Sequence, residues 1–286
     1  MKCFVCGEEM TPYFEKKLSD KENFAEYLGK LDNFEYVRCE NCGLVVSKTL
    51  YEMPREEWSK FSYNAHKALF DGVIDYKILD PSWFERLEIQ TNMFVELVNL
   101  GIFKDDWRTM DFGAGDGKLA NKINERLKKV WLKKFDEYME PLDENYLTKE
   151  EATPQSFDFL VSTSVFEHLL GNQGDVEKVI DFIKPNGTMA LHTLICEEVP
   201  QDPNWFYLLP VPVHCTLWTN KAMSITFKKF GFKGCAYNLD AQMWLFFRDK
   251  NLYLELKNRK NELTGSYFFS ENFVDYWKIK PYRKNK

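Results

Sequence analysis

The sequence predicts an α/β fold built on an open, doubly wound, seven-stranded sheet, with a small metal-binding module in front of it. Two observations support this prediction. A glycine-rich turn, Gly113 to Gly117, lies between a short apolar strand and an amphipathic helix, as in the first βα unit of a parallel sheet. Two Cys-x-x-Cys-Gly units, beginning at Cys3 and Cys39, have the pattern of a zinc ribbon.

Composition limits the classes of function that are open to the chain. With 286 residues and 44% hydrophobic side chains it can bury a full core, and its net charge of −6 disfavours nucleic acid as a partner. The longest apolar run, Trp205 to Val213, is far shorter than a membrane span and contains two prolines. The start, Met1 to Gly7, has no apolar leader. We therefore expect a cytoplasmic protein without a membrane span.

Four cysteines near the start form the metal site that we expect. Cys3 and Cys6 are one pair, Cys39 and Cys42 are the other, and the glycine after each pair lets the backbone fold back toward the sulfurs. Four thiolates favour tetrahedral Zn²⁺ in a closed, structural site that keeps no position for substrate. We expect small buried hydrophobic side chains at the other three cysteines, Cys196, Cys215 and Cys235.

Patterns along the chain suggest four consecutive segments. The zinc ribbon occupies 1–48, and helical spacing of apolar residues indicates a helical connector or cap over 49–106. The glycine turn and the strands after it belong to a ligand-binding sheet domain over 107–250. The remaining segment, 251–286, is expected to be a helical tail with a basic end, because lysines and an arginine gather there.

The glycine turn distinguishes between two kinds of ligand. A dinucleotide fingerprint reads G-x-G-x-x-G/A, whereas Gly113 to Gly117 reads G-x-G-x-G and is followed by Lys118. The pyrophosphate-binding register is therefore absent. An acidic strand residue, Asp111, precedes the turn, and such a carboxylate suits the ammonium group of a ligand that carries an amino acid.

These residues resemble the first motif of the class I S-adenosylmethionine-dependent methyltransferases, and the resemblance covers about half of the chain. Further segments are similar to the second strand with its terminal acidic residue, to the fourth and fifth strands, and to the antiparallel terminal pair: Trp131–Asp136, Ser156–Leu170, Ile183–Leu194 and Gly231–Asp249. The resemblance implies a Rossmann-like sheet that binds S-adenosylmethionine (SAM), with Asp136 accepting the ribose hydroxyls and Glu137 or Glu140 as alternatives. The cofactor-binding residues that it implies are Asp111, Gly113, Ala114, Gly115, Gly117, Asp136, Ser162 and Thr163.

One departure from the family concerns the third strand. Few residues separate Asp136 from Asp158, so the usual second helix and third strand have little room. We expect a degenerate connection there. The family takes its adenine contacts from the end of that strand, which leaves Leu147 or Thr148 as candidates.

Methyl transfer to a hydroxyl group needs a base, and histidine is the natural candidate. His192 ends the predicted fifth strand, at the edge where ligands bind in open sheets. His214 lies in a loop that resembles the one carrying the base in zinc-ribbon-bearing sugar methyltransferases. We predict His214 or His192 as the catalytic base and a capping or packing role for His168.

The order of ribbon, connector and sheet is similar to that of deoxysugar C-methyltransferases. Two departures point away from carbon methylation: Val211 to Val213 replace their Tyr-His-Glu run before His214, and the segment after Asp249 is too short for their extra domain. We therefore predict O-methylation of a sugar, sugar nucleotide or sugar-like small molecule in capsule, other surface-polysaccharide or natural-product biosynthesis. The aromatic segment 204–210 is a candidate wall of the acceptor pocket, or alternatively a loop that covers the core.

Two other functions remain open. Some rRNA methyltransferases also begin with a zinc ribbon, although the negative charge and the lack of an Asn-Pro-Pro-Tyr-like element at Ser162 to Val165 argue against RNA as the acceptor. The other alternative is a non-catalytic cofactor-binding or assembly module. The presence of Asp111, the glycines and Asp136 argues against it.

Overall fold

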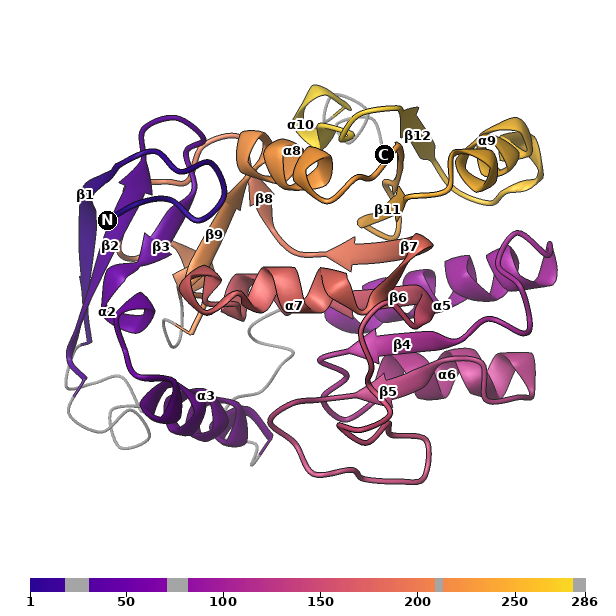
Figure 1. Cartoon of the computed structure of the whole chain (residues 1–286), viewed down its shortest axis with the longest axis horizontal. Coiled ribbons are helices and arrows are strands. Elements are labelled where there is room, and N and C mark those ends of the chain that lie inside the picture. The colour runs from indigo at the N-terminus through magenta and orange to yellow at the C-terminus, as the bar shows by residue number, and fades with distance from the viewer. Residues whose placement is uncertain (19–30, 71–81, 209–212, 280–286) are drawn as a thin grey trace. The chain divides into compact units, whose positions relative to one another are not determined.

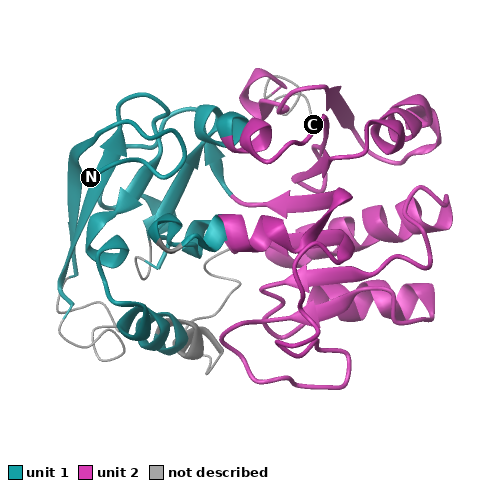
Figure 2. Ribbon diagram, viewed as in Figure 1, with its two compact units in different colours: residues 1–81, 166–176, 194–225 teal, residues 82–165, 177–193, 226–286 magenta. Residues whose placement is uncertain are grey.

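The computed structural model describes residues 1–18, 31–70, 82–208 and 213–279 (Figure 1). The chain divides into two compact units, each assembled from separate stretches of sequence (Figure 2). Unit 1 comprises Met1–Pro81, Phe166–Val176 and Leu194–Ile225, and unit 2 comprises Ser82–Val165, Glu177–Thr193 and Thr226–Lys286. These units differ from the four consecutive segments suggested by the sequence, because two stretches from the middle of the chain group with the ribbon.

A seven-stranded sheet forms the frame of unit 2. Its strands are β4 (Thr109–Phe112), β5 (Lys133–Phe135), β6 (Phe157–Thr163), β7 (Ile183–His192), β10 (Gly234–Asn238), β11 (Met243–Phe247) and β12 (Tyr267–Ser270). They lie in the order β12-β10-β11-β7-β6-β4-β5. The four strands from β7 to β5 are parallel, and β11, β10 and β12 each pair antiparallel with their neighbours. The predicted seven-stranded α/β sheet is confirmed.

The expected degenerate connection after β5 contains a single bridge in place of a third strand. Lys134 and Tyr146 form an isolated parallel bridge. Lys134 N donates to Asn145 O at 2.9 Å, and Leu147 N donates to Lys134 O at 2.6 Å. The seventh strand is β12 at the opposite edge, from the range that the sequence suggested as a tail.

Helices cover both faces of this sheet, as a doubly wound fold requires. One face packs against α5 (Trp83–Asn99), α6 (Lys118–Leu127) and α9 (Lys250–Asn258), which share a core with Phe159 and Ala190 of the central strands. The other face carries α7 (Asp175–Asp181), and α5 and α7 lie on opposite sides of the strands in Figure 1. Phe182, which follows α7, packs against Phe112 with ring centroids 6.0 Å apart. Also in unit 2 are a short helical turn (Lys260–Glu262) and α10 (Tyr276–Ile279), and α8 (Asn220–Lys229) continues into it from unit 1.

Unit 1 contains a five-stranded sheet that extends the zinc ribbon. The ribbon strands are β1 (Met10–Lys17), β2 (Asn33–Cys39) and β3 (Val45–Ser47), and the sheet order is β1-β2-β3-β9-β8. The added strands, β8 (Ile195–Cys196) and β9 (Thr216–Thr219), come from far later in the chain. Val45 pairs with Leu217 and Val46 with Thr216, both antiparallel. The ribbon is therefore part of a larger sheet and is not a separate module within unit 1.

Short helices complete unit 1. α2 (Lys48–Tyr51) and α3 (Arg55–Phe70) follow β3, and single helical turns are formed by Phe166–His168, Gly171–Gln173 and Phe206–Leu208. Phe34, Tyr36 and Trp58 are at most 1% exposed and belong to the hydrophobic core of this unit. Across the part of the chain that the structure describes, no helix combines the length and apolar character needed to cross a membrane.

Candidate active site

The glycine turn joins β4 to α6 at the carboxyl end of the parallel strands. Gly113, Gly115 and Gly117 have φ angles of 71°, 55° and 74°, a region that residues with a side chain rarely adopt. A β-carbon on Gly113 would lie 2.5 Å from the Val165 side chain, and one on Gly117 would lie 2.3 Å from Lys134 Cδ. Gly113 and Gly117 are therefore required both by the backbone path and by the side chains packed against it.

Asp136, the residue after β5, holds the centre of this turn. Its Oδ2 accepts a hydrogen bond from Gly115 N at 3.0 Å, and its Oδ1 accepts from Tyr138 N at 2.9 Å and Met139 N at 3.1 Å. The Tyr146 hydroxyl donates to Gly115 O at 2.6 Å. Both backbone polar groups of Gly115 are thus engaged, and the Asp136 carboxylate lies against the centre of the turn.

Two buried charged residues lie close to the turn. Asp111 is 2% exposed and Lys134 is fully buried. Burial, together with repulsion from Asp136, raises the pKa of Asp111 to about 7. Burial disfavours the ionised carboxylate of Asp111. A cationic ligand group beside it would stabilise the ionised form.

Lys134 connects the turn to the segment that replaces the third strand. Its Nζ donates to Asn121 Oδ1 at 2.9 Å, pairs with Asp143, and lies 4.5 Å from the centre of the Tyr146 ring. Sequence reasoning missed Lys134 and Tyr146. A lysine in a short strand gives no local sign that it is buried, and Tyr146 lies in a stretch without periodicity.

The other predicted site residues of unit 2 lie at the carboxyl ends of β6 and β7. They are Ser162, Thr163 and His192. Ser162 is buried, and its Oγ has no hydrogen-bond partner among the described residues. Thr163 pairs in register with His192, whose Nδ1 is 2.9 Å from Gln242 O. A carbonyl oxygen only accepts, so Nδ1 carries the proton and Nε2 the lone pair in the neutral ring. The Ser162 hydroxyl can therefore serve a ligand, and His192 has the tautomer of a base.

His214 and His168 lie together in unit 1. Their ring centroids are 4.8 Å apart in an edge-to-face arrangement. His168 Nδ1 lies 3.1 Å from Val213 O, and His214 Nδ1 lies 2.5 Å from Tyr207 O. Both neutral rings thus carry the lone pair on Nε2. No local pattern indicates that these histidines are neighbours, because their segments are far apart along the chain.

The aromatic segment proposed for the acceptor contacts the predicted base. The ring centroids of Tyr207 and His214 are 4.1 Å apart, and those of Trp205 and Tyr207 are 5.3 Å apart. Phe206 is 65% exposed. Leu209 and Pro210, the end of this segment, lie outside the described residues.

A protein-family model described as a methyltransferase domain matches residues 88–236, slightly more than half of the chain. The chain belongs to the methyltransferase domain family. The matched range starts in α5 and ends in β10, so it contains the glycine turn, Asp111 and Asp136. No protein with a curated function matches the sequence.

The methyltransferase also has a fold similar to that of several solved structures, at low sequence identity. Phosphoethanolamine N-methyltransferase 2 from Haemonchus contortus is 15% identical with a TM-score of 0.45, covering 88% of this chain and 58% of that one. An O-methyltransferase family protein from Burkholderia thailandensis is 13% identical with a TM-score of 0.42, covering 67% and 61%. Human N-acetylserotonin methyltransferase is 15% identical with a TM-score of 0.40, covering 60% and 58%. The chain spans less than two thirds of each of these proteins, and none of them assigns its acceptor.

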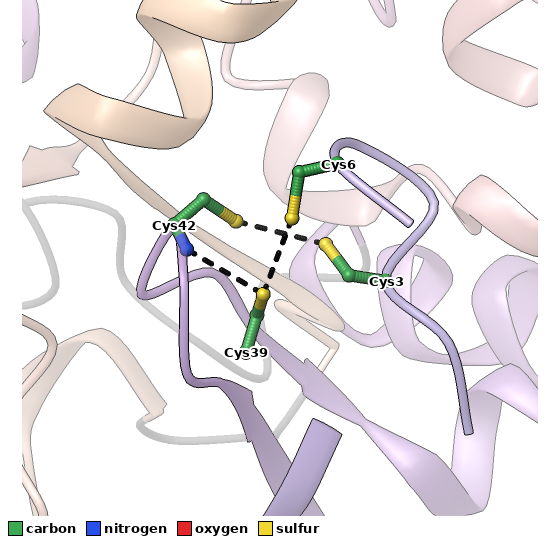
Figure 3. Close-up of side chains that lie close together, drawn as sticks. All are labelled: Cys3, Cys6, Cys39 and Cys42. Atoms are coloured by element: carbon green, nitrogen blue, oxygen red, sulfur yellow. Dashed lines mark hydrogen bonds between the residues drawn. The ribbon is translucent and has the colours of Figure 1, made fainter. Parts of the chain in front are cut away.

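The four ribbon cysteines of the methyltransferase converge in unit 1 (Figure 3). Cys3 Sγ lies 3.6 Å from Cys42 Sγ, and Cys6 Sγ lies 3.4 Å from Cys39 Sγ. All four sulfurs are within 4.8 Å of one another. Tetrahedral Zn–S bonds of about 2.3 Å place sulfurs about 3.8 Å apart, so this donor set fits a zinc ion.

Both cysteine pairs have the backbone path expected from the glycines that follow them. Gly7 and Gly43 have φ angles of 80° and 74°. Gly7 N donates to Cys3 O at 2.8 Å, and Gly43 N donates to Cys39 O at 2.9 Å. Cys42 N also lies 3.5 Å from Cys39 Sγ. The two pairs are therefore repeated copies of one turn, in structure as well as in sequence.

Residues outside the ribbon hold these turns in place. Thr219 Oγ1 donates to Cys42 O at 2.5 Å. The Phe4 ring lies against Gly171, where a β-carbon would be 2.2 Å from the ring, and packs edge-on against Trp218 with centroids 6.0 Å apart. The cysteines outside the cluster are buried as expected, and burial raises their pKa: Cys196, Cys215 and Cys235.

Proposed function

We propose that this methyltransferase uses SAM to methylate a hydroxyl oxygen of a sugar or sugar-like small molecule, and that His214 takes part in removing the hydroxyl proton. The glycine turn carries the proposal. Gly115 is tied to Asp136, and Asp111 is buried beside the turn. Asp136 would accept the ribose hydroxyls of SAM, and Asp111 would receive its ammonium group. When bound, SAM supplies a methyl group activated by a sulfonium.

The protein's own part in such a reaction is to position the acceptor and remove one proton. In-line transfer needs the attacking oxygen aligned with the methyl group, and a base within hydrogen-bond reach of the hydroxyl. The Nδ1 contact with Tyr207 O orients the His214 ring and places the lone pair of the neutral ring on Nε2, the atom that would take the proton. His192, oriented in the same way by Gln242 O, is the alternative base.

Two features support a sugar-like acceptor over a nucleic acid. The aromatic rings of Trp205 and Tyr207 pack next to one another, and Tyr207 packs on His214, so flat apolar surface lies beside the proposed base. Sugar rings present apolar C–H faces that pack against such surfaces. The net charge of −6 would repel a polyanion such as RNA.

The proposal is tested by following S-adenosylhomocysteine formation with purified protein, SAM and separate acceptors. The acceptor set comprises sugar nucleotides, free sugars and an rRNA fragment, and NMR locates the methyl group in any product. We expect transfer to a sugar oxygen. Transfer to RNA alone would replace the proposal with the RNA alternative, and SAM binding without transfer to any acceptor would favour a non-catalytic module.

A further inference from the structure

Three side chains in unit 1 bring metal-ligating atoms together outside the cysteine cluster. They are Glu167 and His168, on the helical turn Phe166–His168, and His214, just before β9. One ligand atom from each lies within 4.8 Å of the other two. We infer that Glu167, His168 and His214 bind a divalent first-row transition-metal ion.

The orientation of both imidazole rings supports this inference. Metal-bound histidines commonly donate their second ring nitrogen to a backbone carbonyl, which fixes the tautomer and the direction of the ring. His168 Nδ1 contacts Val213 O and His214 Nδ1 contacts Tyr207 O, at 3.1 and 2.5 Å. Val213, whose carbonyl His168 contacts, directly precedes His214. The positions of the two imidazole rings are therefore linked.

The helical turn that carries Glu167 is also fixed to β9. Trp218 Nε1 donates to Phe166 O at 3.0 Å, and Thr216 Oγ1 donates to Leu169 O at 2.7 Å. Cys215 Sγ contacts Glu167 O at 3.5 Å. These bonds lie on both sides of Glu167 and His168, so the backbone that presents the ligands is held without an ion.

Burial of Glu167 agrees with a cation site. The residue is 3% exposed, and a cation beside its carboxylate would offset the cost of burying the negative charge. Bonds of about 2.1 Å place neighbouring ligand atoms about 3.0 to 3.4 Å apart, so small side-chain rotations would close a separation of 4.8 Å around an ion. The ligands therefore need little rearrangement.

The ligand types indicate which ions would bind. Two imidazoles and one carboxylate favour Zn²⁺, Fe²⁺, Mn²⁺ and similar ions, whereas Mg²⁺ and Ca²⁺ prefer oxygen ligands alone. Three protein ligands leave coordination positions open, unlike the closed set of four cysteines. The two sites are thus expected to differ in exchange: zinc held by the cysteines stays, and the second ion leaves with a chelator.

A role for this ion in catalysis rests on the proposed function. An ion at an open position lowers the pKa of a coordinated hydroxyl. The O–H bond would then break with the proton going to water, and the oxygen electron pair would form the bond to the methyl carbon. The bond between the methyl carbon and sulfur breaks as the O–C bond forms, and the electron pair of the broken bond stays on sulfur. His214 would then assist deprotonation as a ligand, with no separate base.

Metal binding is measured without any acceptor. Protein that keeps one zinc per chain after dialysis against EDTA is titrated with Mn²⁺, and unbound Mn²⁺ is quantified by electron paramagnetic resonance. We expect one additional Mn²⁺ per chain. Glu167→Gln and His214→Gln each remove a ligand and should weaken Mn²⁺ binding by more than about 100-fold. The matched control His192→Gln should bind Mn²⁺ as the wild type does.

Zinc content and thermal unfolding show whether each variant keeps its fold. If a variant unfolds, NMR of the wild type gives the answer: substoichiometric Mn²⁺ should broaden the imidazole signals of His168 and His214 before those of the other histidines.

Absence of a second ion, unchanged affinity in both ligand variants, or earlier broadening of other histidines would each overturn the site. Mn²⁺ binding without transfer to any hydroxyl acceptor would keep the site and remove the proposed function. Full transfer by the EDTA-treated protein would keep the function and remove the metal from it.

Discussion

Gly117 lies directly against the buried side chain of Lys134, and a β-carbon on the glycine would come within 2.3 Å of Lys134 Cδ. The last glycine of the turn is thus a packing residue as well as the N-cap of α6. Lys134, a residue of β5, occupies the volume that any side chain at position 117 would need.

Gly117→Ala is therefore expected to destabilise the protein for two reasons. A left-handed alanine costs roughly 1–2 kcal/mol, and displacing Lys134 adds about 1–3 kcal/mol. Gly174→Ala is a matched control, because Gly174 has a φ of 70° and no atom within 4 Å of a β-carbon. Urea denaturation gives both free energies of unfolding. Equal losses in the two variants would show that Lys134 does not restrict position 117.

Asp111 should make the stability of the ligand-free protein depend on pH. Its folded-state pKa of about 7 lies above the ordinary value of about 3.9, so the folded protein holds a proton that the unfolded chain releases between these values. The contribution of Asp111 to the free energy of unfolding is therefore full below pH 4 and is lost as the pH rises through 7.

Asp111→Asn removes this titration. The free energy of unfolding of the variant minus that of the wild type should increase by about 2–3 kcal/mol from pH 5 to pH 8. Denaturant titrations at several pH values measure the difference. A constant difference over this range would contradict the raised pKa of Asp111.

Gly115→Val should abolish SAM binding measured by calorimetry. The residue has a φ of 55°, and its N–H and C=O are held by Asp136 and Tyr146, so a branched side chain would displace the centre of the turn. Gly101→Val is the control, because Gly101 also has positive φ, of 67°, with nothing within 4 Å of a β-carbon. Unchanged SAM affinity in Gly115→Val would remove the turn from the cofactor site.

His214→Gln should keep SAM affinity and lose about 10²- to 10⁴-fold in kcat, the usual contribution of a group that manages proton transfer. Calorimetry measures the affinity, and S-adenosylhomocysteine formation measures turnover. His192→Gln, measured in parallel, identifies the alternative base. A fully active His214→Gln enzyme combined with an inactive His192→Gln enzyme would transfer the role to His192.

Replacing Cys39 and Cys42 by serine should lower the metal content by about one zinc per chain, because two of the four thiolate ligands are lost. Metal analysis by mass spectrometry measures the loss. Cys196→Ser is the control, since Cys196 is buried away from the cluster. Zinc retained at full content in the double variant would contradict a four-cysteine site.

Local sequence patterns predicted the central elements of unit 2 well. The strand Thr109–Phe112 has the bounds expected from its apolar residues, and Leu119 and Ile123 of the helix after the glycine turn are buried as their spacing indicated. The strand ending at His192 and the antiparallel pair near the end of the matched range were also found. Apolar residues identified the strand and helix on either side of the glycine turn, and the family resemblance identified the later strands.

Other features depend on contacts between distant residues, which local patterns do not contain. Neither β3 nor β9 has a local pattern that predicts their pairing, because both strands are short and lie far apart in the sequence. Lys134 is buried only because Asn121, Asp143 and Tyr146 surround its ammonium group. Glu167 and His168 follow the common pattern of a strand end, and only the fold brings His214 to them.

The pairing of β3 with β9 affects how the chain is made. Cys3, Cys6, Cys39 and Cys42 are synthesised well before β9, the strand that covers the edge of β3. During translation β3 would present open hydrogen-bonding groups, a condition that favours pairing with other chains. Zinc bound by the two cysteine pairs of the nascent chain would order this edge until β9 is synthesised. Zinc starvation of the cell should therefore reduce the yield of folded protein more than it harms molecules already made.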